Sequence, residues 1–408
     1  MTKLISKKQE IKNRIDLINK GEVPEGYKKR FGYIVPNDWD IVPIKKVVTQ
    51  VRRSVDKPNE PYYRLSVRSH AKGTFHSFVE NPEQVAMEEL FEVKENDLIV
   101  NITFAWEHAI AIVKKEDEGL LVSHRFPTYE FNKNACVKFY ENIIKFPRIK
   151  KMLGDMSPGG AGRNRVLNQT DFYNKLYVPY ASRKEQEKIA EILSCCDKVI
   201  ELKENLLNEE NNKKRIILNK IFSNNGKSTK LSKIALIIMG QSPESKYYNT
   251  EEQGLPLIQG NADCDNKMTK PRFWTSNITK ECKVGDIIMS VRAPAGIISR
   301  AMHNACIGRG VCAIRAKYNP DFLYQYLISI ENKWRRITQG STFEAINSKD
   351  IANILIPDID KKEQEKYSEI LRNCDININL YKQELEQYKQ LKKSLSQLLL
   401  TGIVRTME

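Results

Sequence analysis

One stretch of this 408-residue sequence occurs twice. The five residues Lys-Glu-Gln-Glu-Lys occupy Lys184–Lys188 and return at Lys362–Lys366. Around them, residues 178–197 align without gaps to residues 356–375, and eleven of the twenty positions are identical. The two copies lie much farther apart than the period of a solenoid repeat, which is about 20–50 residues. The sequence therefore predicts one domain-sized unit followed by one long helix, written twice.

Both copies have the pattern of a helix start. Ser182 with Glu185, and Asp360 with Glu363, have the spacing of a capping box. Each predicted helix spans about 40 residues, or roughly 60 Å at ~1.5 Å per residue. A polar helix of this length cannot bury an apolar stripe by itself.

Apolar residues follow these starts at a seven-residue stride. The first copy has the stripes Ile189, Cys196, Lys203 and Ile192, Val199, Leu206; the second has Tyr367, Cys374, Tyr381, Tyr388, Leu395 and Leu371, Ile378, Leu385, Leu399. Such stripes form the seam of a coiled coil. We therefore expect the two helices to pack on each other.

Positive charge is distributed unevenly. The net charge is +15, but residues 182–222 and residues 360–408 each contain nine basic and eight acidic residues. The excess of positive charge therefore lies outside the two helical segments. This partition is typical of a protein whose domains contact a polyanion and whose helices contact protein. A charge that serves solubility alone is the other interpretation.

The cysteines and the apolar runs indicate a cytoplasmic protein. None of the eight cysteines forms a CxxC pair, which disfavours a zinc site or a disulfide framework and favours reduced thiols. The N-terminal residues lack the apolar core of a signal peptide. No apolar run is long enough to cross a bilayer, so no contact with a membrane is predicted.

Between the helical segments, short apolar runs bounded by turn residues predict strands. These runs are Ile41–Val48, Leu98–Ile102, Ala109–Val113 and Ala135–Phe139, followed by a predicted helix at Lys145–Leu153 and a glycine-rich loop at Gly154–Arg165. Three blocks recur in the same order in the second half: Ile44–Val48 with Leu231–Ala235, Asn96–Asn101 with Gly285–Ser290, and Leu167–Phe172 with Ile346–Ile351. The sequences between the blocks do not match. We expect one fold with two different surfaces.

The predicted fold class is α/β (α+β), in two copies separated by two long helices. The predicted boundaries are 1–40 for an N-terminal helix and connection, 41–181 for the first domain, 182–230 for the central helical region, 231–359 for the second domain and 360–408 for the distal helical region.

Motifs of catalysis and cofactor binding are missing from the sequence. It contains no Walker A motif, no G-x-G-x-x-G, no D/N-P-P-Y/F tetrapeptide and no H-E-x-x-H. We therefore predict no catalytic residue, no metal ligand and no cofactor bound by this chain. An enzyme with an unfamiliar active site stays open as an alternative.

The arrangement of two variable domains and two helical segments carries a family resemblance. Each helical segment opens with P-x-x-x-x-[KR]-E-Q-E-K-[IY], and the sequence also contains the GEVPEGYKK entry and the block Gly285–Gly296. This pattern resembles the specificity subunit of type I restriction-modification systems, over nearly the whole chain. The resemblance implies a non-catalytic subunit whose two target recognition domains each read one half of a bipartite sequence in double-stranded DNA.

The resemblance also implies partners. The two helical regions would pack as an antiparallel coiled coil, with an internal pseudo-two-fold repeat, and would dock two methyltransferase (M) subunits. Restriction (R) subunits would join them. S-adenosylmethionine, ATP and Mg²⁺ are implied for the partner subunits only. Within the repeated stretches, the predicted partner-binding residues are Glu185, Glu187, Glu363 and Glu365.

Basic and polar residues in glycine-rich or aromatic contexts are the candidates for DNA contact, because such side chains read base edges and hold phosphates. They are Arg64, Arg68, His70, Lys72, Arg163 and Arg165 in the first domain, and Lys270, Arg272, Arg292, Arg335, Arg336, Ser341 and Thr342 in the second. Arg309, which lies between two glycines in an apolar context, is interpreted as structural. Two further alternatives stay open: a specificity module of another phage-defence methyltransferase system, and a coiled-coil structural protein that does not bind DNA.

Overall fold

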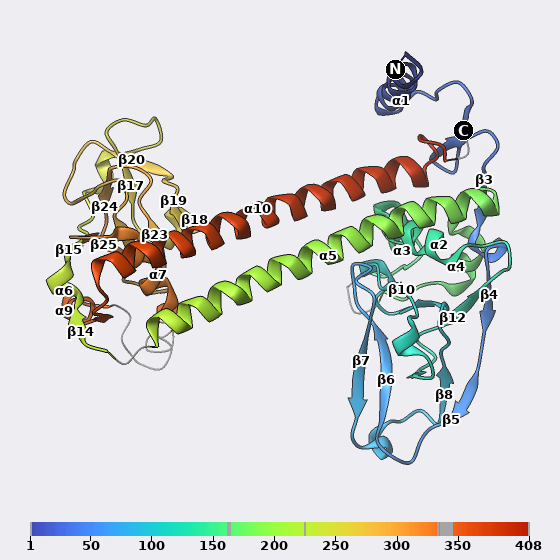
Figure 1. The fold of residues 1–408 in the computed structure, drawn as a ribbon. Coiled ribbons are helices and arrows are strands. Elements are labelled where there is room, and N and C mark those ends of the chain that lie inside the picture. The colour runs from blue at the N-terminus through green and yellow to red at the C-terminus, as the bar shows by residue number, and fades with distance from the viewer. Residues whose placement is uncertain (1, 161–164, 224–225, 333, 335–345, 407–408) are drawn as a thin grey trace. The chain divides into compact units, whose positions relative to one another are not determined.

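The computed structural model describes residues 2–160, 165–223, 226–332, 334 and 346–406 (Figure 1). The chain forms two compact units. Unit 1 comprises Met1–Leu202 with Glu386–Glu408, and unit 2 comprises Lys203–Leu385. Each unit contains one domain and parts of the two 40-residue helices, α5 (Arg183–Phe222) and α10 (Lys361–Leu400).

The first domain contains two main sheets. A four-stranded antiparallel sheet has the order β10-β9-β12-β4, with β4 (Val48–Val51), β9 (Leu98–Val100), β10 (Ile110–Ile112) and β12 (Thr128–Phe131). A five-stranded sheet has the order β5-β8-β11-β6-β7, with β5 (Ser54–Asp56), β6 (Tyr62–Val67), β7 (Thr74–Val79), β8 (Glu89–Glu92) and β11 (Leu121–Val122). Its one parallel pair joins β11 to β6.

Shorter elements complete unit 1. They are the hairpin β1 (Tyr27–Arg30) and β2 (Tyr33–Pro36), the pair β3 (Asp40–Pro43) and β13 (Tyr177–Tyr180), and the helices α1 (Thr2–Asn19), α2 (Val137–Ile143), α3 (Pro147–Asp155) and α4 (Gln169–Lys175).

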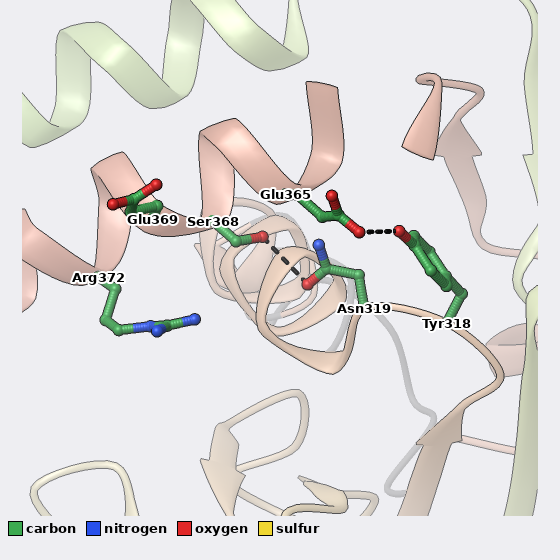
Figure 2. Close-up of a pocket in the computed structure, with 6 residues that line it drawn as sticks. All are labelled: Tyr318, Asn319, Glu365, Ser368, Glu369 and Arg372. Carbon is green, nitrogen blue, oxygen red and sulfur yellow. Dashed lines mark hydrogen bonds between the residues drawn. The ribbon is translucent and has the colours of Figure 1, made fainter. Parts of the chain in front are cut away.

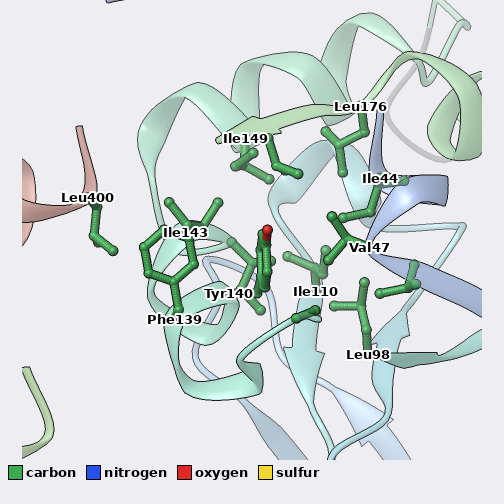
Figure 3. Packing of buried hydrophobic residues seen from close by; sticks show 14 of the residues in the cluster. Ile44, Val47, Leu98, Ile110, Phe139, Tyr140, Ile143, Ile149, Leu176 and Leu400 are labelled. Carbon is green, nitrogen blue, oxygen red and sulfur yellow. The ribbon is translucent and has the colours of Figure 1, made fainter. Parts of the chain in front are cut away.

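The core of unit 1 contains residues of the first domain, of the start of α5 and of the end of α10. Phe139, Tyr140 and Ile143 of α2 pack with Leu98 and Ile110 of the four-stranded sheet, as Figure 3 shows, and Leu400 at the end of α10 belongs to the same buried cluster. Burial of this apolar area is the main favourable contribution to folding.

The second domain also contains two main sheets. The six-stranded sheet has the order β15-β25-β22-β23-β19-β18, with β15 (Ala235–Met239), β18 (Cys264–Asp265), β19 (Met268–Thr269), β22 (Ile287–Ser290), β23 (Ile298–Arg300) and β25 (Val311–Ala316). The five-stranded sheet has the order β16-β20-β17-β24-β21, with β16 (Tyr248–Asn249), β17 (Leu255–Ile258), β20 (Phe273–Thr275), β21 (Glu281–Cys282) and β24 (Ala305–Ile307). The remaining elements are the pair β14 (Ser228–Lys230) and β26 (Leu355–Pro357), and the helices α6 (Leu231–Ile234), α7 (Pro320–Ser329) and α9 (Ser348–Ala352).

The two domains repeat one strand topology. The order β4-β12-β9-β10 of the first corresponds to β15-β25-β22-β23 of the second, and all of these pairs are antiparallel. In the other sheet, β6 pairs with β7 and, in parallel, with β11, just as β17 pairs with β20 and, in parallel, with β24. The chain therefore folds the same topology twice.

The recurring sequence blocks occupy matching places in this topology. Asn168 caps α4 by accepting a hydrogen bond from the backbone of Asp171, and Asn347 caps α9 in the same way from Asp350. An asparagine side chain at this position satisfies a helix N–H that has no partner within the helix. The blocks 167–172 and 346–351 therefore match because both begin the same short helix.

A buried aspartate marks a second pair of blocks. Asp97 accepts the backbone N–H of Lys94, and Asp286 accepts that of Lys283, in the turn before β9 and before β22. Each carboxylate also pairs with an arginine: Asp97 with Arg53 at 2.5 Å and Asp286 with Arg315 at 2.6 Å. Both carboxylates are buried, and burial of a charge is costly unless the charge is paired and hydrogen-bonded.

Two predicted strands were wrong in part. Ala135–Phe139 was expected to be a strand, but α2 begins at Val137 because Phe139, Tyr140 and Ile143 bury one face at helical spacing. The expected strand Ile41–Val48 is divided, since a turn of 3-10 helix at Ile44–Lys46 separates β3 from β4.

The burial of α5 differs from the predicted stripes. Leu206 was assigned to the seam, but it is 42% exposed, whereas Leu193 is fully buried in the core of unit 1. Paired apolar residues at 192–193, 199–200 and 206–207 leave two seven-residue registers open in the sequence. Packing of Leu193 against the first domain selects the register that includes it.

Ion pairs connect α5 to α10 within each unit. In unit 2, Lys203 of α5 lies 2.7 Å from Glu384 of α10, and Lys214 lies 2.5 Å from Asp375. The partner numbers fall as the α5 numbers rise, so the two helical stretches of unit 2 run in opposite directions. In unit 1, Lys392 pairs with Asp197.

In the part of the chain that the structure describes, no helix combines the length and the apolar character that a membrane span requires.

Candidate nucleic-acid interface

Loops of the first domain meet around an open hollow. The loops after β6, β9 and β11 (residues 68–73, 101–109 and 123–127) contribute to its lining, and its volume is about 550 Å³. The lining includes Arg68, His70 and Lys72. Three of the predicted DNA-contacting side chains therefore share one surface, and the hollow also has aromatic neighbours in Phe75, Phe104 and Phe126.

The turn that carries these residues is fixed to the neighbouring loop. The backbone N–H of His70 donates to the carbonyl of Glu107, and that of Ala71 donates to the carbonyl of His108, both at 2.8 Å. His70 and Ala71 have φ angles of 63° and 50°, in the left-handed region that residues other than glycine rarely adopt. Such a conformation persists where surrounding contacts hold it. The side chains of this turn therefore project from a constrained backbone.

Arg68 and Arg64 differ in what surrounds them. The guanidinium of Arg68 lies 5.4 Å from the ring centre of Phe75, and its side chain is exposed. Stacking on a ring leaves the N–H groups at the guanidinium edge able to donate. Arg64 is half-buried in β6, opposite Ser77. Arg68 is the better placed of the two for a contact outside the protein.

Exposed aromatic residues on the β6–β7 hairpin were not predicted. The rings of Tyr63 and Phe78 lie 4.9 Å apart, and their side chains are 55% and 56% exposed. In the second domain, the register places Trp274 of β20 opposite Pro256 of β17, in the place that Phe78 has opposite Tyr63. The signal in the sequence was the presence of aromatic residues in short runs that also contain polar and charged residues, as in Tyr62–Val67 and Thr74–Val79.

Arg165 is engaged by its own loop. Its Nε donates to the carbonyl of Ser157 at 3.0 Å, and one terminal nitrogen donates to the carbonyl of Gly154 at 2.8 Å. The guanidinium also lies 5.3 Å from the ring of Trp106. These contacts give Arg165 a structural role that the sequence did not indicate.

Two predicted residues of the second domain form intramolecular ion pairs. Arg272 lies 2.8 Å from Asp263, whose side chain is 2% exposed, and Lys270 lies 3.6 Å from Asp265. Asp263 is buried, so its pairing with Arg272 stabilises the loop after β17. The Lys270 pair is exposed and contributes little to stability.

Arg292 and Arg309 lie on adjoining loops. The backbone N–H of Val291 donates to the carbonyl of Gly310 at 2.9 Å, which connects the loop after β22 to the loop after β24. Both arginine side chains are exposed. Arg309 was interpreted as a structural residue, and its backbone N–H does bond to Ser242 at 3.1 Å, while its side chain is exposed.

Five predicted residues lie outside the part of the chain that the structure describes: Arg163, Arg335, Arg336, Ser341 and Thr342. The residues that follow these two stretches are held alike. Leu167 donates its backbone N–H to Ile102, and Ile346 donates to Val291, both at 2.8 Å.

Within the described residues, no group of His, Cys, Asp and Glu side chains could hold a metal ion. His108 is buried, and burial lowers its pKa, while its Nε2 bonds to the carbonyl of Ile144 at 2.7 Å. Burial alone would raise the pKa of Asp117, but hydrogen bonds from Thr74 and His76 hold it below its usual value. These contacts connect structural elements and do not form a reactive cluster.

The family model for the type I restriction modification DNA specificity domain matches the sequence twice, at residues 36–211 and 225–390. The chain belongs to this family. Each matched segment contains one domain and much of the helix that follows it, so the family pattern and the structural repeat coincide.

A curated relative and two solved structures are similar to this chain over most of its length. The putative type I restriction enzyme MjaX specificity subunit of Methanocaldococcus jannaschii is 29% identical, over 93% of this chain and 97% of the relative. A chain solved in work on complex assembly and conformational transition of the type I R-M system superimposes with a TM-score of 0.62, at 23% identity, over 91% of this chain and 99% of that chain. The type I restriction-modification S subunit from M. genitalium gives 0.58 at 15% identity, over 93% and 99%. The two structural likenesses support the fold.

The two repeated stretches of this specificity-family chain have different surroundings. Glu185 was predicted at a partner surface, but its side chain is 2% exposed. It accepts hydrogen bonds from Trp39 Nε1 at 2.9 Å and from Arg405 at 2.8 Å. The prediction of Glu185 as a partner contact is therefore corrected, because the C-terminal residues of the chain cover it. Glu187 stays at the surface, where it pairs with Arg183 at 2.7 Å.

Glu363 and Glu365 are both exposed. Glu365 accepts a hydrogen bond from the hydroxyl of Tyr318, which raises the pKa of that hydroxyl. Figure 2 shows this pair in a shallow pocket of about 390 Å³, where Ser368 also bonds to Asn319 at 3.0 Å. The start of α10 therefore exposes both carboxylates, whereas the start of α5 buries Glu185 and exposes only Glu187.

Proposed function

We propose that this chain is the DNA-recognition subunit of a type I restriction-modification complex, and that each domain reads one half of a bipartite target in double-stranded DNA. The observation that carries this proposal is one strand topology built twice with different loops. The loop after β6 is a short turn with Arg68 and Lys72, whereas the loop after β17 contains β18 and β19. Base edges are read by side chains that enter a groove, so different loops on one scaffold select different bases.

Selection from random double-stranded DNA tests this function. The full chain, purified with its methyltransferase partner, should enrich two unlike short sequences separated by a fixed number of unspecified base pairs. Enrichment of one continuous sequence, or of none, would contradict the proposal. The chain without partners is expected to transfer no methyl group to DNA, because we assign S-adenosylmethionine, ATP and Mg²⁺ to the partner subunits.

We further propose that α5 and α10 form an antiparallel coiled coil that relates the two halves by a pseudo-two-fold axis. This rod would dock two M subunits, which R subunits would join, in the cytoplasm. Two observations support the proposal. The ion pairs of unit 2 join helical stretches that run in opposite directions, and both helices have exposed apolar residues. The latter are Leu202, Leu206, Ile216, Ile376, Leu380 and Leu391. Exposed apolar residues on a helix are typical of a surface that another protein covers.

The carboxylates at the start of α10 give a test of docking. Reversing Glu363 and Glu365 to lysine should weaken assembly with the methyltransferase by about 1–2 kcal/mol, since exposed ion pairs contribute up to ~1 kcal/mol each. Assembly can be titrated by native mass spectrometry. Because Glu365 also bonds to Tyr318, Tyr318→Phe is the matched control and should leave assembly unchanged. Equal assembly of the double variant and the parent would exclude these residues from the interface.

A further inference from the structure

An arginine that was not among the predicted DNA contacts occupies the same loop in both domains. The loop between β11 and β12 contains Arg125, and the loop between β24 and β25 contains Arg309. β11 and β24 are the strands that pair in parallel with β6 and β17. β12 lies between β4 and β9 in its sheet, and β25 lies between β15 and β22, the corresponding strands of the second domain. The two loops therefore hold equivalent positions in the fold.

Matching hydrogen bonds fasten both loops. Ile102, just beyond β9, donates its backbone N–H to the carbonyl of Arg125 at 3.0 Å. Val291, just beyond β22, donates to the carbonyl of Gly310 at 2.9 Å. Ile102 and Val291 are also the residues whose carbonyls accept the N–H of Leu167 and of Ile346. The same pair of contacts thus holds each loop beside the stretch that precedes the short helix α4 or α9.

The arginine backbone is fixed as well. The N–H of Arg125 bonds to the hydroxyl of Ser123 at 3.4 Å, and that of Arg309 to the hydroxyl of Ser242 at 3.1 Å. A Cβ added to Gly310 would lie 2.1 Å from the carbonyl oxygen of Gln259. Backbone therefore packs directly on backbone there, so the 308–310 loop lies against the residue that follows β17.

Neither guanidinium has a polar partner in the part of the chain that the structure describes. Both side chains are exposed, and among the described residues no hydrogen bond or ion pair involves either guanidinium. Other arginines nearby behave differently: Arg53, Arg272 and Arg315 each pair with a buried aspartate. Arg125 adjoins Phe126 in the lining of the first-domain hollow, and Arg309 adjoins the loop of Arg292. Each free guanidinium thus lies beside a candidate reading surface.

We propose that Arg125 and Arg309 each bind a backbone phosphate of DNA, one beside each half-site. A guanidinium presents a planar set of donors that matches a phosphate. Both loops are short and hydrogen bonds fix their backbones to neighbouring segments, so we assign the long arginine side chains to phosphates at the groove edge. Phosphate contacts fix the register of a protein on the duplex and carry no base information. The inference rests on the proposed function, since it requires that both domains face DNA.

The test is the salt dependence of binding by the full chain. Arg125→Ala, Arg309→Ala and the double variant are titrated by fluorescence anisotropy with the duplex obtained by selection and with a random duplex of equal length. Each single substitution should weaken binding to both duplexes by the same factor and should reduce the slope of log K against log salt by about 0.9. The double variant should lose about twice that slope. Arg309→Lys should keep most of it, because the charge is retained.

Lys233→Ala is the matched control. Lys233 is exposed and lies before β15, whereas Gly240, which packs on Gly308, follows that strand, so the control lies at the opposite end of the strand. Its slope should equal that of the parent. An unchanged slope in Arg125→Ala or Arg309→Ala would overturn the inference, and so would a loss confined to the selected duplex. Failure of the parent to prefer the selected duplex would instead contradict the proposed function.

Discussion

Substitution of Arg405 by alanine is expected to lower the free energy of unfolding of unit 1 by about 3–5 kcal/mol, the usual cost of removing one partner of a buried ion pair. The Arg405 and Glu185 side chains are 16% and 2% exposed, and their atoms lie 2.8 Å apart. Arg405 also lies 2.7 Å from Asp38. Without Arg405, the hydrogen bond from Trp39 is the one that the buried carboxylate of Glu185 keeps among the described residues.

Hydrogen exchange in the full chain measures this effect where it should occur. Protection should fall for amides of the first domain and stay unchanged in the second. Arg372→Ala is the control, because Arg372 pairs with Asp321 at 2.8 Å but is 60% exposed, and it should cost about 0–1 kcal/mol. Adding Glu185→Gln to Arg405→Ala should recover part of the loss, since it removes the buried charge. Equal effects of Arg405→Ala and Arg372→Ala would refute the buried pair.

Replacing both Arg68 and Lys72 with alanine is expected to remove most of the preference for one half-site. Both residues line the first-domain hollow and project from the constrained turn at His70 and Ala71. Each lost base contact costs about 1–3 kcal/mol, so the pair should cost roughly 2–6 kcal/mol, or about 30-fold to 20,000-fold in affinity.

Repeating the selection with this double variant checks the prediction. The bases of one half-site should become variable, while the other half-site and the spacer length stay as in the parent. Lys175→Ala is the control, because Lys175 lies on α4 and pairs with Asp171 in solvent. Relaxation of both half-sites to the same extent would show that the two domains do not read separately.

The repeat in the sequence was enough to predict two domains and two helices, because matching blocks such as 167–172 and 346–351 encode matching local contacts. Asn168 and Asn347 illustrate this, since a helix cap depends on residues only a few positions away. The register of α5 could not be predicted in the same way. Both seven-residue registers of α5 contain apolar residues. Packing of Leu193 in the core of unit 1, which includes residues far away in the sequence, decides between them.

The candidate site was predictable only in part, for a similar reason. Glu185 and Glu363 have the same local sequence, yet their surroundings differ. Arg405, which lies far along the chain, covers Glu185, whereas Glu363 is exposed. Arg165 and Arg272 look like free cations in the sequence but are engaged by carbonyl groups or a buried acid. Arg309 is the converse case, since its flanking glycines and apolar context led to a structural interpretation while its side chain faces solvent.

The most direct test of the central claim is a map of methylated bases in host DNA, by single-molecule sequencing, with and without the gene for this chain. If each domain reads half of a bipartite target, one family of methylated sites should depend on the gene. Those sites should contain two unlike half-sites with a spacer of fixed length and free sequence. A gene-dependent site that is continuous, or a methylation pattern that does not change when the gene is removed, would contradict the account.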